Sequence, residues 1–359
     1  MLYMSMRKKE VFQVIGCMSG TSADGIDLAL LETDGKDYVH PLSSAEFPYT
    51  LEEKKIIKAA FGLRDKNNPL VQKATDVITQ AHIRALKEVE WEADMIGFHG
   101  QTIFHAPDRQ ITIQIGDAQT IAIEMDIPVV YDMRKNDVAN GGQGAPLLPL
   151  YHHARLVDHG EPVVILNIGG VSNVTYCDGN NILAFDTGTG NAMVDDWIAK
   201  NTEQAFDKDG DIAASGHADT DLLDKWLAHP YFDKAPPKSL DRNDFQNFSV
   251  EGLSLENGAA TLMAFTALSI AKAQEHFPHK AQKYFVTGGG RKNKALMALL
   301  AIHCEATFMP VEELGWNGDS LEAEGFAYLA VRSHLGLPLT LPTTTGCKEP
   351  LTGGQKALP

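Results

Sequence analysis

The fold is decided by the stretch Gly16-Cys17-Met18-Ser19-Gly20-Thr21-Ser22-Ala23-Asp24-Gly25-Ile26-Asp27. Apolar runs at residues 11–16 and 26–32 lie on either side of a loop rich in glycine, hydroxyl and carboxylate groups. Glycine lets the backbone curl so that successive N–H groups point toward an anion. The same residues also suit a tight polar hairpin in which the aspartates serve the turn. The stretch therefore predicts two strands joined by either a phosphate-binding loop or a structural turn.

A similar arrangement returns twice further along the chain. Residues 163–168 and 173–177 are predicted strands around Gly169-Gly170, and a predicted strand at 284–287 enters Gly288-Gly289-Gly290. The sequence contains no G-x-x-x-x-G-K-[ST] P-loop, and no G-x-G-x-x-G precedes a helix. Each patch alone could be a close-packed turn. Three such patches without those motifs favour a nucleotide that is held from several sides.

The order of the predicted elements indicates an α/β protein with two domains. Short β-rich runs alternate with longer helical patterns, and 359 residues are too many for one small core. A strand, a glycine turn and a second strand open each half of the chain. We therefore expect two similar domains that face each other across a cleft. Their expected bounds are 1–138 and 139–337, with the tail 338–359 packing back on the first.

Composition excludes several classes of partner. The formal net charge of −16 argues against a nucleic acid, which requires clustered Lys and Arg. No apolar run reaches the roughly 18 residues that a membrane helix needs. The four cysteines are scattered and form no C-x-x-C pair, so neither a disulfide framework nor a zinc site is expected. We expect a cytoplasmic protein.

Asp186 is the candidate catalytic residue. It follows the predicted strand 182–185 and precedes Thr187-Gly188-Thr189-Gly190 and a helical pattern. A carboxylate at the carboxyl end of a strand is well placed for proton transfer in a cleft. The alternative is that Asp186 only orders the turn through hydrogen bonds to the backbone.

Two further polar segments follow predicted strands, His99-Gly100-Gln101-Thr102 and Asp132-x-Arg134-x-x-Asp137. Arg134 could hold a substrate carboxylate through two parallel hydrogen bonds, or it could form a structural ion pair with Asp132 or Asp137. Because the histidines of this region lack a third ligand nearby, we predict no metal site there.

Taken together, these residues resemble the 1,6-anhydro-N-acetylmuramic acid kinase family. The resemblance extends in order along nearly the whole chain, so no single short stretch carries it. The matching segments are Gly16 to Asp27, His99-Gly100-Gln101-Thr102, Asp137-Val138-Ala139, Gly141-Gly142-Gln143-Gly144-Ala145-Pro146-Leu147, Leu166-Asn167-Ile168-Gly169-Gly170, Phe185-Asp186-Thr187-Gly188 with Gly190-Asn191, Phe206-Asp207-Lys208-Asp209-Gly210, Pro237-Lys238-Ser239 and Glu324-Gly325-Phe326-Ala327.

The resemblance implies a fold and a reaction. The fold is α/β, with two RNase H-like domains of the actin and hexokinase type flanking an interdomain ATP cleft. The enzyme is a phosphotransferase that uses ATP and Mg²⁺, and the resemblance also implies a homodimer. Water opens the anhydro bond of the sugar and O6 receives the γ-phosphoryl group. The products are ADP and N-acetylmuramic acid 6-phosphate, an intermediate in peptidoglycan recycling.

The resemblance also implies residue roles. Asp186 is the catalytic base, and substrate contacts fall to Ser19, Thr102, Arg134 and Glu324. ATP binding is implied for Gly20, Thr21, Ser22, Ala23, Asp24, Gly25, Ile26, Asp27, Gly169, Gly170, Gly288 and Gly289. Met18 and Asn167 stand where many members of the wider superfamily carry Asp. The metal ligand is therefore expected to be Asp24, or water alone.

Two rival functions remain open on the sequence. A non-catalytic ATP-binding switch of the chaperone or actin type needs a partner-binding domain or a polymerising surface, and the sequence indicates no spare domain. A nucleotide-dependent hydrolase would open the anhydro sugar without trapping phosphate, and its product would distinguish it from a kinase.

Overall fold

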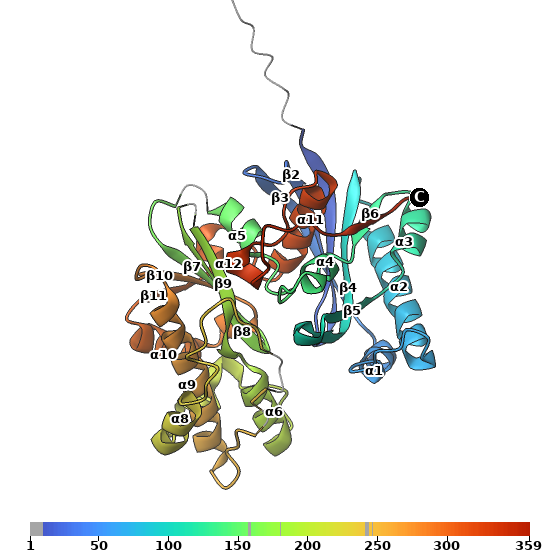
Figure 1. Ribbon diagram of the computed structural model, residues 1–359. Helices are drawn as coiled ribbons and strands as arrows, with labels where there is room; N and C mark the ends of the chain where they lie inside the picture. The colour runs from blue at the N-terminus through green and yellow to red at the C-terminus, as the bar shows by residue number, and fades with distance from the viewer. Residues whose placement is uncertain (1–9, 157–158, 180, 241–243, 246) are drawn as a thin grey trace, which may run out of the picture. The chain divides into compact units, whose positions relative to one another are not determined.

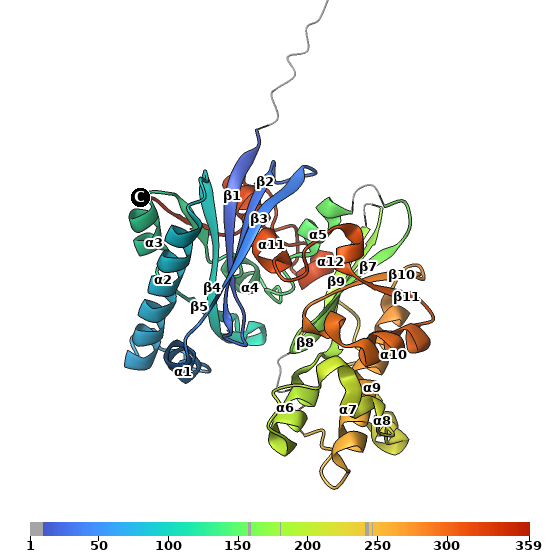
Figure 2. The same ribbon diagram turned by 180° about the vertical axis from the view of Figure 1, so that it is seen from behind.

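The computed structural model describes residues 10–156, 159–179, 181–240, 244–245 and 247–359. The chain forms two compact units, each built on its own sheet (Figures 1 and 2). Unit 1 comprises Met1–Asn140, Glu322–Thr340 and Pro350–Pro359. Unit 2 comprises Gly141–Leu321 and Leu341–Glu349.

The sheet of unit 1 has the order β3-β2-β1-β4-β6-β12, and β5 pairs with β4 as a hairpin. The first three strands are antiparallel, whereas β4 runs parallel to β1 and β6 parallel to β4. The strands are β1 (Phe12–Ser19), β2 (Gly25–Thr33), β3 (Val39–Pro48), β4 (Met95–Ala106), β5 (Ile111–Ile115), β6 (Val129–Tyr131) and β12 (Gln355–Ala357).

The sheet of unit 2 repeats this plan in the order β9-β8-β7-β10-β11. Again three antiparallel strands are followed by two parallel ones. The strands are β7 (Val163–Ile168), β8 (Val171–Asp178), β9 (Asn181–Thr189), β10 (Lys283–Thr287) and β11 (Thr307–Pro310). An antiparallel three-stranded meander extended by parallel strands is the arrangement expected of RNase H-like domains, and it occurs in both units. The predicted fold class, α/β with two domains of this type, is therefore confirmed.

Helices connect these strands, and local signals mark several of their starts. In α1, Thr50 and Glu53 form a capping box, and in α2 the Asn68 side chain caps a helix whose first residue is Pro69. The helices of unit 1 are α1 (Leu51–Ala59), α2 (Pro69–Val89), α3 (Ala118–Met125), α4 (Lys135–Ala139) and, from its second residue on, α11 (Leu321–His334). Those of unit 2 are α5 (Pro149–Arg155), α6 (Ala192–Asn201), α7 (Asp211–Ala214), α8 (Thr220–Leu227), α9 (Leu255–Ala273), α10 (Lys294–Cys304) and α12 (Pro342–Thr345).

A pair of glycines brings α11 onto the sheet of unit 1. Gly16 of β1 lies directly opposite Gly97 of β4 in the parallel register. A Cβ atom on Gly16 would lie 1.8 Å from the carbonyl oxygen of Ala323, and one on Gly97 would lie 2.2 Å from that of Phe326. The backbone of α11 thus contacts the backbone of the sheet, which only glycine permits.

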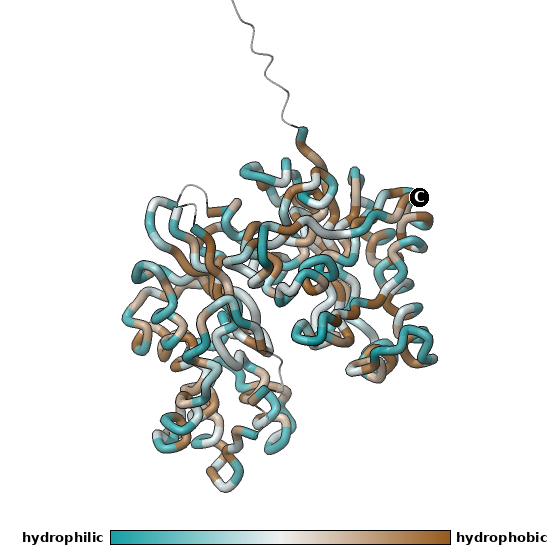
Figure 3. Tube along the Cα trace, in the orientation of Figure 1, coloured by the Kyte–Doolittle hydropathy of each residue, from teal (hydrophilic) through white to brown (hydrophobic). Residues whose placement is uncertain are grey.

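Each sheet buries an alternating set of apolar side chains. In β1, Ile15 and Cys17 face the core formed with α2, while Gly16 between them faces α11. In unit 2, the core includes Leu166 and Phe185 of the sheet together with residues of α6, α8, α9 and α10. Figure 3 shows apolar residues gathered along the strands, with hydrophilic residues at the loops.

Two parts of this fold were not foreseen from the sequence. The strand β3 carries exposed residues such as His40, Ser43 and Ser44, and its sequence has no apolar run. The helix α11, which falls within the predicted second domain 139–337, belongs to unit 1 because its backbone packs on Gly16 and Gly97. The segment 350–359 lies in unit 1, where β12 pairs with β6, whereas 341–349 lies in unit 2.

We predict that Gly16→Ala strongly destabilises the protein, by on the order of 3–5 kcal/mol, because the new methyl group overlaps a helix backbone that cannot rotate away. Chemical denaturation followed by circular dichroism measures this. The control is Gly160→Ala, where a Cβ atom meets nothing within 4 Å. A Gly16→Ala variant as stable as that control would contradict the contact.

Candidate functional site

The loop after β1 is held by one amide side chain from the neighbouring strand. Gln101 of β4 lies opposite Ser19 in the register. The Ser19 Oγ donates to Gln101 Oε1 at 2.7 Å, and Gln101 Nε2 donates to the carbonyl of Gly20 at 3.0 Å. The Tyr49 hydroxyl lies 2.9 Å from Ser19 Oγ. Ser19, a predicted substrate contact, is therefore buried and already engaged with Gln101 and Tyr49.

The loop divides into exposed and buried residues. Thr21 and Ser22 are exposed, whereas the side chains of Ala23 and Ile26 lie in the core of unit 1. Of the predicted ATP-binding residues, these last two can therefore offer a ligand only their backbone. Asp24 is 74% exposed and forms an ion pair with Lys54 at 3.1 Å.

Two further residues of the predicted ATP-binding set, Gly25 and Asp27, lie in β2, where the pairing of the strands determines their surroundings. A Cβ atom on Gly25 would lie 2.6 Å from the carbonyl oxygen of Phe47, so the pairing of β2 with β3 requires glycine there. Asp27, which is half-buried, lies opposite Met18 in β1.

A second cluster combines three of the singled-out residues, His99 and Thr102 within β4 and Arg134 at the start of α4. The Arg134 Nε donates to His99 Nε2 at 3.1 Å, and the Thr102 Oγ1 lies 3.5 Å from the same ring nitrogen. Thr102 Oγ1 also accepts a hydrogen bond from Gln114 Nε2 at 3.1 Å. The structure thus brings Thr102 and Arg134 together through His99.

The ring of His99 is neutral in this arrangement. Arg134 is permanently protonated and can only donate, so His99 Nε2 must accept and the ring proton lies on Nδ1. Burial and the nearby guanidinium of Arg134 lower the pKa of His99 well below 6.5. His99 also packs on Phe326 of α11, with ring centroids 4.6 Å apart. Glu324, the fourth predicted substrate contact, lies buried on this same helix.

Asp186 in unit 2 is held mainly by backbone groups. Its N–H donates to the carbonyl of Lys238 at 2.9 Å, and the N–H of Leu240 donates to its Oδ2 at 2.8 Å. The Tyr231 hydroxyl donates to the carbonyl of Asp186. The side chain is 6% exposed. The segment around Lys238 was singled out in the sequence only through the resemblance, because no local pattern links it to Asp186.

The position of Asp186 corrects one expectation. It lies within β9, which continues to Thr189, rather than after the end of a strand. The strand continues because Asp186 pairs with Asn173 while Gly188 pairs with Ser172, which leaves Thr187 as a bulge. Bulges re-aim side chains and are over-represented next to active sites.

The two glycine patches of unit 2 lie at the ends of parallel neighbours β7 and β10. The carbonyl of Gly169 accepts from the N–H of Asn191 at 2.7 Å, and that of Gly170 accepts from the N–H of Gly190 at 3.0 Å. The carbonyl of Gly288 accepts from Arg291 Nη1 at 3.0 Å. Arg291 is nearly buried and pairs with Glu312 and Asp319. Sequence reasoning missed this anchor because its partners lie well outside any local pattern, 21 and 28 residues further along the chain.

Glycine is required by the fold at some of these positions and not at others. Gly288 has a φ of +74°, and a Cβ atom on Gly290 would lie 2.5 Å from Ile168. By contrast, a Cβ atom would meet nothing closer than about 3.7 Å at four glycines, none of which has a positive φ. These four are Gly20, Gly169, Gly170 and Gly289. The chain itself gives no steric reason for glycine at these four sites.

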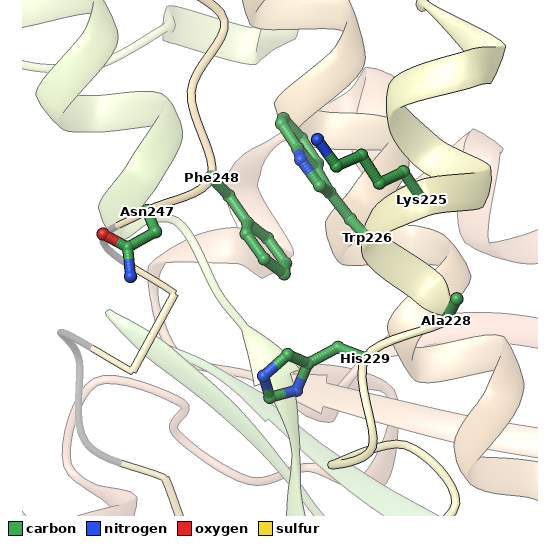
Figure 4. Close-up of a pocket in the computed structure, with 6 residues that line it drawn as sticks. All are labelled: Lys225, Trp226, Ala228, His229, Asn247 and Phe248. Carbon is green, nitrogen blue, oxygen red and sulfur yellow. The ribbon is translucent and has the colours of Figure 1, made fainter.

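A pocket of about 320 Å³ lies elsewhere in unit 2, beside α8. Its lining includes the stacked rings of Trp226 and Phe248 with His229 beside them (Figure 4). None of the predicted site residues lines it. In the described part of the chain, no group of three His, Cys, Asp or Glu side chains could hold a metal ion. No helix in that part is long and apolar enough to span a membrane.

A family model described as anhydro-N-acetylmuramic acid kinase matches residues 12–357 of the sequence. The chain belongs to this family. The resemblance drawn from the motifs is thereby confirmed.

Curated members of the anhydro-N-acetylmuramic acid kinase family match over almost their whole length. The one from Rhizorhabdus wittichii is 45% identical over 354 residues, which cover 95% of this chain and 97% of the relative. The one from Paramagnetospirillum magneticum is 46% identical over 356 residues, covering 96% and 99%. Among solved structures, an activator of 2-hydroxyisocaproyl-CoA dehydratase from Clostridium difficile matches at a TM-score of 0.45 and 12% identity, covering 89% of this chain and 94% of that one.

We predict that His99 of this kinase-family chain stays neutral well below pH 6.5, as nitrogen-detected NMR of the imidazole ring would show. Because the folded pKa lies below the unfolded value, the contribution of His99 to stability is present above about pH 6.5 and is lost as the pH falls. Arg134→Met should raise the pKa of His99, since it removes a nearby positive charge. The control Arg109→Met, at an exposed arginine, should not. An ordinary pKa for His99 in the unmodified protein would refute the arrangement.

Proposed function

We propose that this chain is an ATP-dependent kinase that opens 1,6-anhydro-N-acetylmuramic acid with water and phosphorylates O6. The products are N-acetylmuramic acid 6-phosphate and ADP, and the role is the recycling of cell-wall sugars. The observation that carries the proposal is the family match over residues 12–357, with curated relatives that align over nearly all of both chains. The chain is a phosphotransferase with an alcohol group as acceptor.

The reaction couples two bond exchanges. The water oxygen bonds to C1 as the C1–O6 bond breaks, and O6 bonds to the γ-phosphorus as the bond to ADP breaks. Water is a weak nucleophile at neutral pH, so a base within hydrogen-bond reach must take its proton. We assign this role to Asp186, because it is buried and oriented by the N–H of Leu240. Capture of O6 by phosphorus spares a separate general acid.

Arg134 is the proposed partner of the sugar's lactyl carboxylate. Its guanidinium is oriented by the neutral ring of His99, and a planar guanidinium suits a carboxylate. Thr102 lies beside the same ring, which supports its assignment as a second contact. Glu324 and Ser19 complete the proposed set. The engagement of the Ser19 hydroxyl with Gln101 and Tyr49 favours a role in shaping the loop alongside any contact with the sugar.

The four glycines without a steric reason support the ATP site. Backbone without side chains allows a phosphate or ribose to approach closely, which is a use of glycine distinct from turn geometry. Gly20, Gly169, Gly170 and Gly289 all belong to the set that the resemblance implies for ATP. Thr21 and Ser22 add exposed hydroxyl donors, while Gly25, Gly288 and the buried Ala23 and Ile26 shape the backbone around them.

Magnesium is proposed to accompany ATP. Mg²⁺ is commonly held by phosphate oxygens, several waters and one or two carboxylates, and bound there it would offset charge on the phosphoryl oxygens. Asp24 is exposed and able to approach such an ion, but its ion pair with Lys54 would have to open. This contact favours coordination through water and phosphate over direct ligation by Asp24.

A homodimer and a cytoplasmic location are proposed on the resemblance. The four cysteines are free and buried, which suits a reducing compartment. Burial raises the pKa of Cys17, of Cys177 to about 12 and of Cys304 to about 12, so none of these three is a reactive thiolate.

The experiment that tests the function is turnover of the anhydro sugar with ATP in ¹⁸O-water, read by mass spectrometry. We expect label at C1 together with phosphate on O6. Asp186→Asn should keep both substrates bound but lower kcat by several orders of magnitude, since the amide cannot take the proton. The control is Asp209→Asn at a partly exposed turn with a φ of +56°, which asparagine also tolerates.

Two results would overturn parts of this proposal. Labelled sugar without phosphate would identify a nucleotide-dependent hydrolase instead. Near-normal kcat in Asp186→Asn would show that Asp186 only orders its strand, as the alternative interpretation of the sequence holds.

We predict that Gly170→Ala and Gly289→Ala weaken binding of a non-hydrolysable ATP analogue by about tenfold or more while leaving the melting temperature nearly unchanged. Both positions have room for a methyl group in the chain itself, so only a ligand should collide with it. Calorimetry measures the affinity, and Gly160→Ala serves as the control. Unchanged affinity in both variants would argue against a nucleotide at these glycines.

A further inference from the structure

One buried lysine ties together the segment that holds Asp186. Residues 231–240 touch Asp186 at three points, through the Tyr231 hydroxyl, the Lys238 carbonyl and the Leu240 N–H. The side chain of Lys238 turns back on this same segment. Its Nζ donates to the carbonyls of Tyr231 at 3.0 Å and Phe232 at 3.1 Å. The ammonium of Lys238, near the end of the segment, is thus hydrogen-bonded to Tyr231 and Phe232 at its start.

The third neighbour of this ammonium is His276. Lys238 Nζ lies 3.3 Å from His276 Nε2, which is also 3.2 Å from the Phe232 carbonyl. The ring of His276 packs edge-on against Phe185, the residue before Asp186, with centroids 5.6 Å apart. A charged Lys238 has three donors, enough for the two carbonyls and for Nε2 in the tautomer whose ring proton lies on Nδ1. A neutral lysine keeps two donors, but its hydrogen bonds to the two carbonyls are no longer charge-assisted and are therefore weaker.

The environment of Lys238 is costly for a charge. The residue is only 3% exposed, so the ammonium loses most of its hydration. Its hydrogen-bond partners are two carbonyls and a neutral ring rather than a carboxylate, although its position over the ring of Tyr231, 4.7 Å from the centroid, is favourable. Burying a charge is unfavourable unless it is paired and fully hydrogen-bonded, so the fold retains this ammonium at a cost.

We propose that Lys238 is a positioning residue for Asp186: its ammonium locks residues 231–240 so that their backbone orients the carboxylate toward the reacting water. The inference rests on the proposed role of Asp186 as the base. It requires the charged form, because the hydrogen bonds that an ammonium donates to the Tyr231 and Phe232 carbonyls are charge-assisted and stronger than those of a neutral amine.

The charged groups around Lys238 determine when it loses its proton. The pKa of Lys238 is lowered to about 8, mainly by burial; Lys272 and Lys234 contribute to the lowering, while Asp233 and Glu275 oppose it. Burial and the nearby Lys238 also lower the pKa of His276, consistent with a neutral ring. Lys272 itself lies 3.5 Å from Asp233 and 3.8 Å from Glu275.

As the pH rises and Lys238 loses its proton, activity should fall while the contribution of Lys238 to stability should rise. The folded pKa lies below the unfolded value of 10.5, so between about pH 8 and 10.5 the unfolded chain binds more protons. The contribution of Lys238 to stability therefore rises with pH in this window. The lock on Asp186 weakens over the same window, so kcat/KM should fall as the pH rises through about 8. A residue that only stabilises the fold would not produce this divergence.

The first test is Lys238→Met, assayed with ATP and the anhydro sugar across pH 6–10. We expect kcat to fall about 10- to 100-fold at pH 7, as for a misplaced catalytic group, with KM for both substrates nearly unchanged. The fall in kcat/KM near pH 8 should disappear. Retention of wild-type kcat and of the alkaline fall would overturn the inference.

The second test uses two variants that leave Lys238 and its hydrogen-bond partners in place, so it remains decisive if Lys238→Met does not fold. Lys272→Met removes a neighbouring positive charge and should move the alkaline fall to higher pH. Asp233→Asn removes a negative charge and should move it to lower pH, each by on the order of 0.3 unit. Activity at pH 7 should be unchanged in both. Shifts that are absent or in the same direction would overturn the inference.

Failure of the proposed function would look different. Near-normal turnover by Asp186→Asn removes the base itself and overturns both proposals. An inactive Asp186→Asn beside a fully active Lys238→Met with an unaltered pH profile overturns only the role of Lys238.

Discussion

The contact between α11 and the paired glycines of β1 and β4 is the constraint on which unit 1 depends. Because Gly16 and Gly97 have no side chains, a helix backbone rests on the middle of the sheet. The same two strands carry the polar residues a few positions further on, with Ser19 at the end of β1 and His99 and Gln101 in β4. The helix in turn supplies Phe326 against His99. One steric fit therefore sets both the core of the unit and the orientation of Arg134 through His99.

The sheet of unit 2 repeats the strand order of unit 1, but its candidate catalytic residue, Asp186, is held in another way. A Cβ atom on Gly188 would lie 2.6 Å from Ser269, so a helix again approaches a glycine of the sheet. Asp186, two residues earlier, is contacted by backbone groups of Lys238 and Leu240 and by the Tyr231 hydroxyl, and it lies beside a bulge. A carboxylate held by these groups keeps its orientation as long as the holding segment keeps its shape. The orientation of Asp186 therefore depends on the shape of residues 231–240. Among the described contacts, those of the Lys238 ammonium hold this segment together.

The sequence allowed the glycine loops, the two-domain α/β plan and the family to be predicted, because each depends on local pattern or on motifs in order. It could not distinguish glycines that the fold requires, such as Gly16 and Gly290, from those such as Gly170 that it does not. That distinction depends on atoms far away in the chain, such as Ala323 opposite Gly16. The strand β3 was missed because a strand at the edge of a sheet exposes polar residues and has little apolar signal. The contacts of Lys238 could not be predicted from the sequence either, because the periodicity of apolar residues does not indicate which carbonyls a buried ammonium will contact.

On the proposed function, this acidic chain binds two anions, ATP and a sugar carboxylate, against its own charge of −16. Glycines at which the chain leaves room would let backbone N–H groups, which carry no net charge, supply part of the local attraction. Where a full positive charge is used, at Arg134, the neighbouring imidazole is kept neutral by burial. A charged His99 would repel the guanidinium and could no longer accept from it. The low pKa of His99 is thus a requirement of the carboxylate binding proposed for Arg134, and under that proposal it links the burial of one ring beneath α11 to the recognition of the substrate.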